Sequence, residues 1–222
     1  MALKEELQQH LAEFKQRMSP EVIATVQADV DALIASDFAG GAVKEGDTAP
    51  DFELPGVHGN PVTLASLLAQ GPVVLAFYRG GWCPYCNLQL RAYQRILPEI
   101  RELGGQLVAI SPEPPDASLT TAEKNELEFE VLSDMDVQVA RAYRILFDLS
   151  ETLQKTYVGM GKDLTELNAD GEWHLPIPAT YVIAQDGRVA LSYVDAEYRN
   201  RLEPADILAA LQRLKAPAEQ TT

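Results

Sequence analysis

Apolar residues recur at helical spacing over the first part of the chain. They predict an amphipathic helix over residues 2–18 and a second helix that begins at Ser19-Pro20 and ends before Gly40-Gly41. Ser19 is a favoured cap and Pro20 a favoured first residue of a helix. The two stripes consist of Leu3, Leu7, Leu11, Phe14 and Met18, and of Val22, Ile23, Val26, Val30, Leu33 and Ile34. Such a helical arm can pack on its own domain or pair with a second subunit, and the pattern leaves both open.

From Thr48 onward, short strands alternate with helices. The continuous apolar run 73–78 predicts a strand buried on both faces, and 107–110 predicts the next buried strand. The helix between them contains Pro98, which removes a backbone donor and predicts a kink. This unit implies parallel strands joined by a right-handed crossover. Elsewhere we expect strands at 51–54, 129–132, 180–184 and 189–194, and helices at 119–127, 136–145 and 204–214.

The pattern therefore predicts one α/β domain over residues 46–222, preceded by an N-terminal helical arm over residues 1–45. Apolar residues make up 46% of the chain, which is enough for a sizeable core. The net charge of -15 argues against nucleic acid and membrane surfaces as partners, because both favour clustered Lys and Arg. No apolar run approaches the roughly 18 residues of a spanning helix, and the charged N-terminus lacks the apolar core of a signal peptide. We therefore expect a cytoplasmic protein.

Both cysteines of the chain lie where a buried strand gives way to a helix. At a helix N-terminus, free N–H groups and the macrodipole favour an anion. We therefore expect Cys83 to be the exposed nucleophile with a lowered pKa, and Pro84 to be the first helical residue. Cys86, one turn further in, is expected to resolve the reaction and to keep a pKa near its ordinary value of about 8.5.

Three other interpretations of the cysteines are available. A zinc site needs two more ligands, but the histidines are spread over His10, His58 and His174, and there is no second CxxC. Inert buried thiols need no proline between them. A structural disulfide is unusual in a reducing compartment. The spacing favours a reversible redox pair, with no metal and no other cofactor.

Other candidate site residues lie on either side of the cysteines. A cis peptide bond before Pro178 would turn the backbone toward the cysteines, whereas the alternative is an ordinary strand-initiating proline. His174 is a candidate proton carrier, or else a solvated loop histidine. Trp82 can cover the thiolate or simply pack. Tyr143 and Tyr157 are expected in the core.

The stretch Trp82-Cys83-Pro84-Tyr85-Cys86 resembles thioredoxin in its tryptophan and glutaredoxin in its Cys-Pro-Tyr-Cys. The surrounding chain is similar to the peroxiredoxin and alkyl hydroperoxide reductase superfamily, and most of all to bacterial peroxiredoxin-like proteins with a GGWCPYC stretch. The resemblance covers about residues 48–214 and implies a thioredoxin fold and thiol-based reduction. The stretches that carry it are GDTAPDFELPGVHGNPVTLASLL (46–68), VVLAFYRGGWCPYCNLQL (73–90), LVAISPEPPDAS (107–118), FEVLSDMD (129–136) and PATYVIAQDGRV (178–189).

The chain departs from the typical member of that superfamily at three positions. A typical member has a proline seven residues and a threonine or serine three residues before its reactive cysteine, where this chain has Ala76 and Gly80. It also has an arginine where this chain has Pro178. Arg79 is the candidate substitute for that arginine.

The resemblance implies a peroxidase in which Cys83 attacks a peroxide and becomes a sulfenic acid, and Cys86 resolves it as a disulfide. A thioredoxin- or glutaredoxin-like donor would then restore both thiols. The first alternative is a general disulfide reductase, which Gly80 and Pro178 favour. The second is a redox-sensing interaction protein whose arm changes partners, including pairing as a homodimer.

Overall fold

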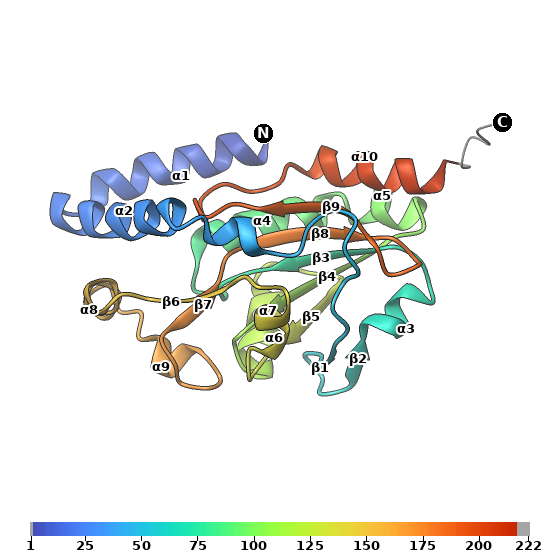
Figure 1. Ribbon diagram of the computed structural model, residues 1–222. Coiled ribbons are helices and arrows are strands. Elements are labelled where there is room, and N and C mark those ends of the chain that lie inside the picture. Colours follow the sequence, from blue (N-terminus) through green and yellow to red (C-terminus); the bar gives the residue numbers. More distant parts are fainter. Residues whose placement is uncertain (1, 217–222) are drawn as a thin grey trace.

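A mixed five-stranded sheet forms the centre of the molecule (Figure 1). The computed structural model describes residues 2–216, so residues 217–222 of the predicted domain lie outside it. Strand order is β5-β4-β3-β8-β9, with β3, β4 and β5 parallel to one another and β8 antiparallel to both β3 and β9. The strands are β3 (Val73–Phe77), β4 (Gln106–Ser111), β5 (Glu130–Ser133), β8 (Ala179–Ile183) and β9 (Val189–Val194). This confirms the predicted α/β class.

Strand β3 is the centre of the sheet and is buried along its whole length. Alternate side chains enter two separate apolar cores because successive residues of a strand point to opposite faces. One core is covered by α4 (Pro84–Arg95), α5 (Leu97–Glu102) and α10 (Pro204–Lys215). The other is covered by β1 (Glu53–Pro55), β2 (Pro61–Thr63), α3 (Leu64–Leu68) and α7 (Gln138–Ala142).

The unit from β3 through α4 and α5 to β4 confirms the predicted strand–helix–strand arrangement. The predicted kink is a full break: α4 ends at Arg95, Ile96 caps it, and α5 begins at Leu97. Pro98 lies in the first turn of α5, where backbone N–H groups form no intrahelical hydrogen bond, so the missing N–H of proline costs nothing there. The break lets the chain turn back toward β4.

The segment between residues 146 and 176 contains elements that the sequence pattern did not predict. They are β6 (Leu146–Asp148), α8 (Glu151–Gly159), α9 (Leu164–Leu167) and β7 (His174–Pro176). Strands β6 and β7 pair as a small antiparallel ribbon. In the neighbouring segment, α6 (Pro115–Lys124) begins earlier than expected and α7 is shorter. Pro114 and Pro115 explain the early start, because proline suits the first positions of a helix.

The N-terminal arm folds onto its own domain. Helix α1 (Leu3–Arg17) packs against α4, and α2 (Pro20–Ala35) packs against α8 before a short 3-10 turn, η1 (Phe38–Gly41). Leu3 and Leu7 are buried among the residues of α4 and α10, and Val26 is buried against α8. The arm therefore packs on its own domain, while its pairing with a second subunit stays a prediction.

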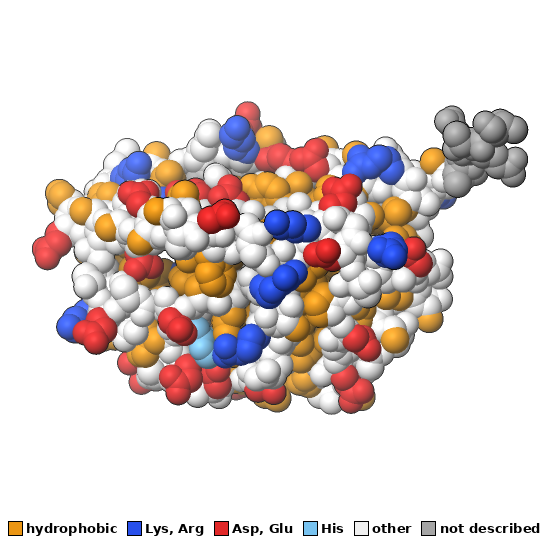
Figure 2. Space-filling model, viewed as in Figure 1, with side chains coloured by type: hydrophobic (Ala, Val, Ile, Leu, Met, Phe, Trp, Pro, Cys, Tyr) orange, Lys and Arg blue, Asp and Glu red, His pale blue; other side chains and the backbone are white. Residues whose placement is uncertain are grey.

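The surface of the molecule carries charges of both signs. Figure 2 shows acidic and basic side chains interspersed over one face, although the chain as a whole carries a net charge of -15. Within residues 2–216, no helix is both long and apolar enough to cross a membrane.

Candidate active site

The loop after β3 places the two cysteines at the start of α4. Cys83 is the N-cap residue of α4, Pro84 is its first residue, and Cys86 lies in the first turn. The two cysteines approach within 3.2 Å of each other, and both are free thiols. The backbone N–H of Cys83 donates to the Gly80 carbonyl at 3.1 Å, which closes the loop. The predicted position of the pair at a strand-to-helix junction is therefore confirmed.

Both thiols are buried. Cys83 is only 2% exposed and Cys86 is fully inaccessible. The expectation of an exposed Cys83 was wrong, because the aromatic side chains of Trp82, Tyr85 and Tyr198 belong to the same apolar cluster and cover it. A reactant of Cys83 must therefore be small, or the cover must move.

The pKa of the Cys83 thiol is strongly lowered despite its burial. Burial by itself raises the pKa of a thiol. For Cys83 this is outweighed by the hydrogen bond from the Cys86 thiol, by the positive charges of Arg79 and Arg201, and by the backbone N–H of Cys86. Together these lower its pKa to about 5, so Cys83 is a thiolate at neutral pH.

Cys86 behaves in the opposite way. Burial, the hydrogen bond to Cys83 and the negative charge of Cys83 hold its pKa well above the ordinary value. The Arg201 guanidinium, with Nη2 3.6 Å from Sγ, and the backbone N–H of Arg79, at 3.5 Å, oppose this shift without reversing it. The expectation of a nearly ordinary pKa was therefore wrong, and Cys86 stays protonated.

Arg79 points into the site. It is 3% exposed, and its Nη2 donates to the hydroxyl of Tyr157. Its guanidinium lies 4.3 Å from the ring centroid of Tyr198 and 5.2 Å from that of Trp82. Nε of Arg79 has no hydrogen-bond partner in the described part of the chain. Tyr157 is buried, as predicted for a core residue, but it also holds this arginine.

Arg201 is a site residue that the sequence did not reveal. Its Nε donates to Oε1 of Gln89 at 2.7 Å, and its Nη1 to the Asn200 carbonyl at 2.7 Å. These bonds hold the guanidinium against Cys86. The sequence feature that could have drawn attention to Arg201 is the basic pair at 199 and 201, which lies in an acidic chain just before the last helix. Nothing in the local pattern connects that pair with a cysteine more than a hundred residues earlier.

Pro178 and His174 differ from expectation. Every peptide bond among the described residues is trans, so the predicted cis bond before Pro178 is wrong. The proline nevertheless lies near the cysteine loop, since the pairing of Ala179 with Phe77 places it at the end of β3. His174 is buried in β7 rather than solvated in a loop, and its Nε2 lies 2.8 Å from Oδ2 of Asp170, which favours a structural role over proton transfer at the cysteines.

Gly80 has no room for a side chain. It has a φ of 139°, and a Cβ placed there would lie 2.4 Å from Nε1 of Trp82. The indole therefore occupies the space beside position 80. Trp82 is half-buried and lies edge-on to Tyr157, and Nζ of Lys162 donates to its carbonyl at 2.9 Å. Trp82 thus both packs and helps to cover the thiolate.

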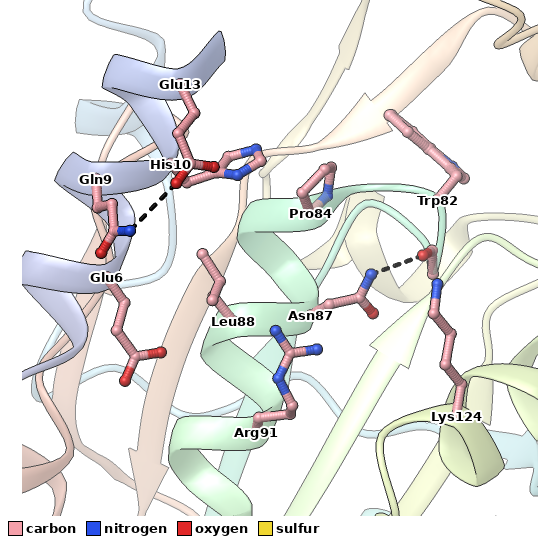
Figure 3. A pocket seen from close by; sticks show the side chains of 11 residues that line it. Glu6, Gln9, His10, Glu13, Trp82, Pro84, Asn87, Leu88, Arg91 and Lys124 are labelled. Atoms are coloured by element: carbon pink, nitrogen blue, oxygen red, sulfur yellow. Dashed lines mark hydrogen bonds between the residues drawn. The ribbon is translucent and has the colours of Figure 1, made fainter. Parts of the chain in front are cut away.

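A cleft of about 580 Å³ opens beside the start of α4 (Figure 3). Helix α1 forms one wall with His10, whose ring lies edge-on to Tyr85, while Arg91 of α4 lies on the other side. Trp82 and Pro84, the neighbours of Cys83 in the sequence, also line the cleft. The arm therefore contributes directly to the surroundings of the site.

The paired thiols and the sheet order are those expected of a thiol oxidoreductase, and residues 45–192 match the sequence profile of the AhpC/TSA family. The chain belongs to the AhpC/TSA family. The predicted peroxiredoxin superfamily and thioredoxin-like fold are thereby confirmed, while membership of the subgroup with the GGWCPYC stretch stays a prediction. This AhpC/TSA protein is a thiol-dependent peroxidase that uses a peroxide and a thiol reductant.

Individual relatives agree with this assignment. Peroxiredoxin Bcp of Escherichia coli K12 is 32% identical over 130 residues, which cover 59% of this chain and 82% of the relative. The crystal structure of peroxidoxin BcpB from Mycobacterium tuberculosis is 28% identical, with a TM-score of 0.63 over 77% of this chain and 97% of that one. Peroxiredoxin Q of Xanthomonas campestris, at 20% identity and a TM-score of 0.60, covers 79% of this chain and 99% of its own, and shows the common fold.

Proposed function

We propose that this AhpC/TSA protein reduces its peroxide at Cys83 and resolves the product with Cys86. The observation that carries the proposal is the pairing of a thiolate with a protonated thiol 3.2 Å away. A thiolate is the nucleophile in this chemistry, and the neighbouring thiol is placed to complete a disulfide.

The reaction proceeds in two steps. The Cys83 thiolate attacks the terminal oxygen of the peroxide, the O–O bond breaks, and the leaving oxygen takes up a proton to become an alcohol or water. Cys83 is then a sulfenic acid. Cys86 loses its proton and attacks the Cys83 sulfur, an S–S bond forms, and the hydroxyl leaves as water. A thioredoxin- or glutaredoxin-like dithiol donor reduces the disulfide and is itself oxidised.

Two arginines support the first step. The charges of Arg79 and Arg201 both lower the pKa of Cys83. Arg79 also has an unsatisfied hydrogen-bond donor, because its buried Nε has no partner among the described residues. We propose that this N–H donates a hydrogen bond to the peroxide oxygens. It would take the role of the arginine that a typical superfamily member has at the position of Pro178. Trp82 and Pro84 shape the path by which the peroxide approaches Cys83. Pro178 supports the cysteine loop that follows β3.

A general disulfide reductase is the second candidate. The absence of any side chain at Gly80, where a typical member of the superfamily has a hydroxyl, favours it. The 2% exposure of Cys83 favours the peroxidase, because a peroxide is small whereas a protein disulfide needs an accessible sulfur. A cytoplasmic location and pairing of two copies through the arm stay predictions.

Stopped-flow measurement of peroxide reduction tests the proposal in the wild type, Cys83→Ser and Cys86→Ser. Cys83→Ser should abolish the reaction. Cys86→Ser should react once and then stall, and mass spectrometry after one equivalent of peroxide should find the added oxygen, or a mixed disulfide, on Cys83. An adduct on Cys86 would reverse the two roles. Oxidation no faster than that of a free thiol, together with active insulin reduction, would favour the disulfide reductase.

A further inference from the structure

A buried carboxyl group lies against the loop that leads to Cys83. Glu113 follows β4 and is 3% exposed. Its Oε2 accepts the backbone N–H of Gly81 at 2.8 Å, and its own backbone N–H donates to Oγ of Ser111 at 3.3 Å. The carboxyl group is therefore fixed to the backbone two residues before the nucleophile.

The second oxygen of Glu113 reaches the space beside Gly80. A Cβ placed on Gly80 would lie 2.9 Å from Oε1 of Glu113 and 2.4 Å from Nε1 of Trp82. The carboxyl oxygen and the indole N–H thus fill the position from which a side chain at residue 80 would project. Nε1 of Trp82 is buried and has no hydrogen-bond partner among the described residues. The indole N–H of Trp82 and the carboxyl group of Glu113 therefore both lie beside the cysteine loop.

The surroundings of Glu113 favour its protonated form. Burial raises the pKa of this carboxyl group, the Gly81 N–H lowers it, and the negative charge of Cys83 raises it further, to about 7. Tyr78, directly after β3, also interacts with this carboxyl group, and burial together with the charge of Glu113 raises the pKa of Tyr78. Helix α6 presents the neutral Thr121 hydroxyl next to Gly81. Two lysines lie near this loop: Nζ of Lys162 donates to the Trp82 carbonyl, and Lys124 of α6 lines the cleft beside Gly81 and Trp82.

We propose that Glu113 is the proton-holding residue of the peroxidase site, keeping a proton while Cys83 is a thiolate and releasing it to the leaving oxygen. The inference rests on the proposed function of Cys83. The step balances: Cys83 thiolate, peroxide and protonated Glu113 give Cys83 sulfenic acid, alcohol and ionised Glu113. Loss of the thiolate charge makes release of the proton easier, since that charge had favoured the protonated acid.

The first test counts protons during a single turnover. Wild type and Glu113→Gln are oxidised by one equivalent of hydrogen peroxide in weakly buffered solution near pH 6.5 with a pH indicator. Glutamine retains an acceptor for the Gly81 N–H, so the loop should keep its conformation. The variant should take up about one proton from solvent for each disulfide formed, whereas the wild type should take up clearly less. Glu123→Gln, on the exposed face of α6, is the matched control and should behave as wild type.

The pH dependence of the same reaction separates proton release from a merely structural role. Below pH 7, Glu113→Gln should be oxidised about tenfold more slowly than wild type. The difference should disappear above about pH 8, where Glu113 has lost its proton in the wild type as well. Equal proton uptake and equal rates in the two proteins would overturn the inference and leave the roles of the cysteines intact.

A second measurement needs no peroxide. Infrared difference spectra between the dithiol and the disulfide, formed with a small disulfide oxidant, should show loss of a protonated carboxyl band near neutral pH. The band should be missing from Glu113→Gln and present in Glu123→Gln. A wild-type spectrum without this change would contradict the proposal even if Cys83 proved unreactive toward peroxide.

Discussion

Two guanidinium groups, far apart in the sequence, help to keep one of the adjacent cysteines ionised. Arg79 belongs to the cysteine loop, whereas Arg201 comes from the segment before α10. Both lower the pKa of Cys83, and Arg201 also lies 3.6 Å from Cys86 Sγ. The two cations therefore stabilise a thiolate within the pair, whereas burial and the hydrogen bond between the two sulfurs keep the proton on Cys86 and the charge on Cys83.

Arg201→Met should raise the pKa of Cys83 by about one unit, because an opposite charge within a few ångströms lowers a pKa by about that much or more. The ultraviolet absorbance of the thiolate, followed as a function of pH in the reduced protein, measures this. Arg199→Met is the matched control, since Arg199 is paired with Glu197 at 2.5 Å and should leave the titration almost unchanged. An unchanged pKa in Arg201→Met would remove this arginine from the account of the site.

Gly80→Ser, which introduces the hydroxyl of a typical superfamily member, should lower peroxidase activity by at least about tenfold rather than raise it. Its Cβ would lie 2.4 Å from Nε1 of Trp82, at a φ of 139° that side chains rarely adopt. The displaced indole would no longer cover the thiolate. The peroxide rate constant and the fluorescence of Trp82, with a Trp173→Phe background to isolate its signal, report the two effects. Higher activity in Gly80→Ser would contradict this prediction and would show that the side chains around position 80 can rearrange to accept a serine.

At the scale of elements, the N-terminal arm acts as part of the site rather than as an appendage. Helix α1 packs on α4, the helix whose start carries both cysteines, and its His10 faces Tyr85. Leu7 is 6% exposed and belongs to the same apolar cluster as Cys83. Stabilising α1 should therefore also stabilise the start of α4.

Leu7→Ala should lower the free energy of unfolding by about 2–3 kcal/mol, the lower part of the range for buried leucines. It should also increase the rate at which a small alkylating reagent reaches Cys83, because α1 would hold the start of α4 less firmly. Denaturant unfolding and alkylation kinetics measure the two quantities. Gln8→Ala, exposed on the same helix, is the control and should change neither. Equal stabilities of the two variants would mean that α1 adds little to the domain.

At the scale of the whole molecule, the buried thiolate links the redox site to the stability of the fold. A cysteine has a pKa of about 8.5 in an unfolded chain, whereas folding lowers that of Cys83 to about 5. A lowered pKa contributes stability that is fully present above the unfolded value and is lost as pH falls through the folded value. The raised pKa of Glu113 acts in the opposite direction, because ionisation of this carboxyl group is easier in the unfolded chain.

The difference in unfolding free energy between reduced wild type and Cys83→Ser should therefore increase from pH 5 to pH 8, with a slope of at most about 1.4 kcal/mol per pH unit. Comparison of these two proteins largely cancels the contribution of Glu113, which both contain. The upper limit of pH 8 avoids ionisation of Cys86 in the unfolded chain. Denaturant unfolding at several pH values gives the slope, and a flat or falling difference would contradict a thiolate at Cys83.

The sequence by itself determined the features that depend on neighbouring residues. Apolar periodicity predicted the arm helices, the buried β3 and β4 and the helix between them, because burial repeats with the geometry of each element. Pro98 marked the break between α4 and α5, and the spacing of Cys83 and Cys86 predicted their place at the start of α4. These are local properties, so a short window of sequence contains them.

Only the tertiary structure decided what approaches that site from elsewhere in the chain. Glu113 reaches the site from the segment after β4, and Arg201 reaches it from the segment before α10. The arm and the aromatic residues around Cys83 bury a thiol that the local pattern placed at an exposed helix end. The segment 146–176 was missed because its short strands and helices are stabilised by contacts with α2 and with each other rather than by a long periodic stripe. The tertiary fold decides which residues that are distant in the sequence come into contact. A hydrophobic pattern read along the chain contains no information about these contacts.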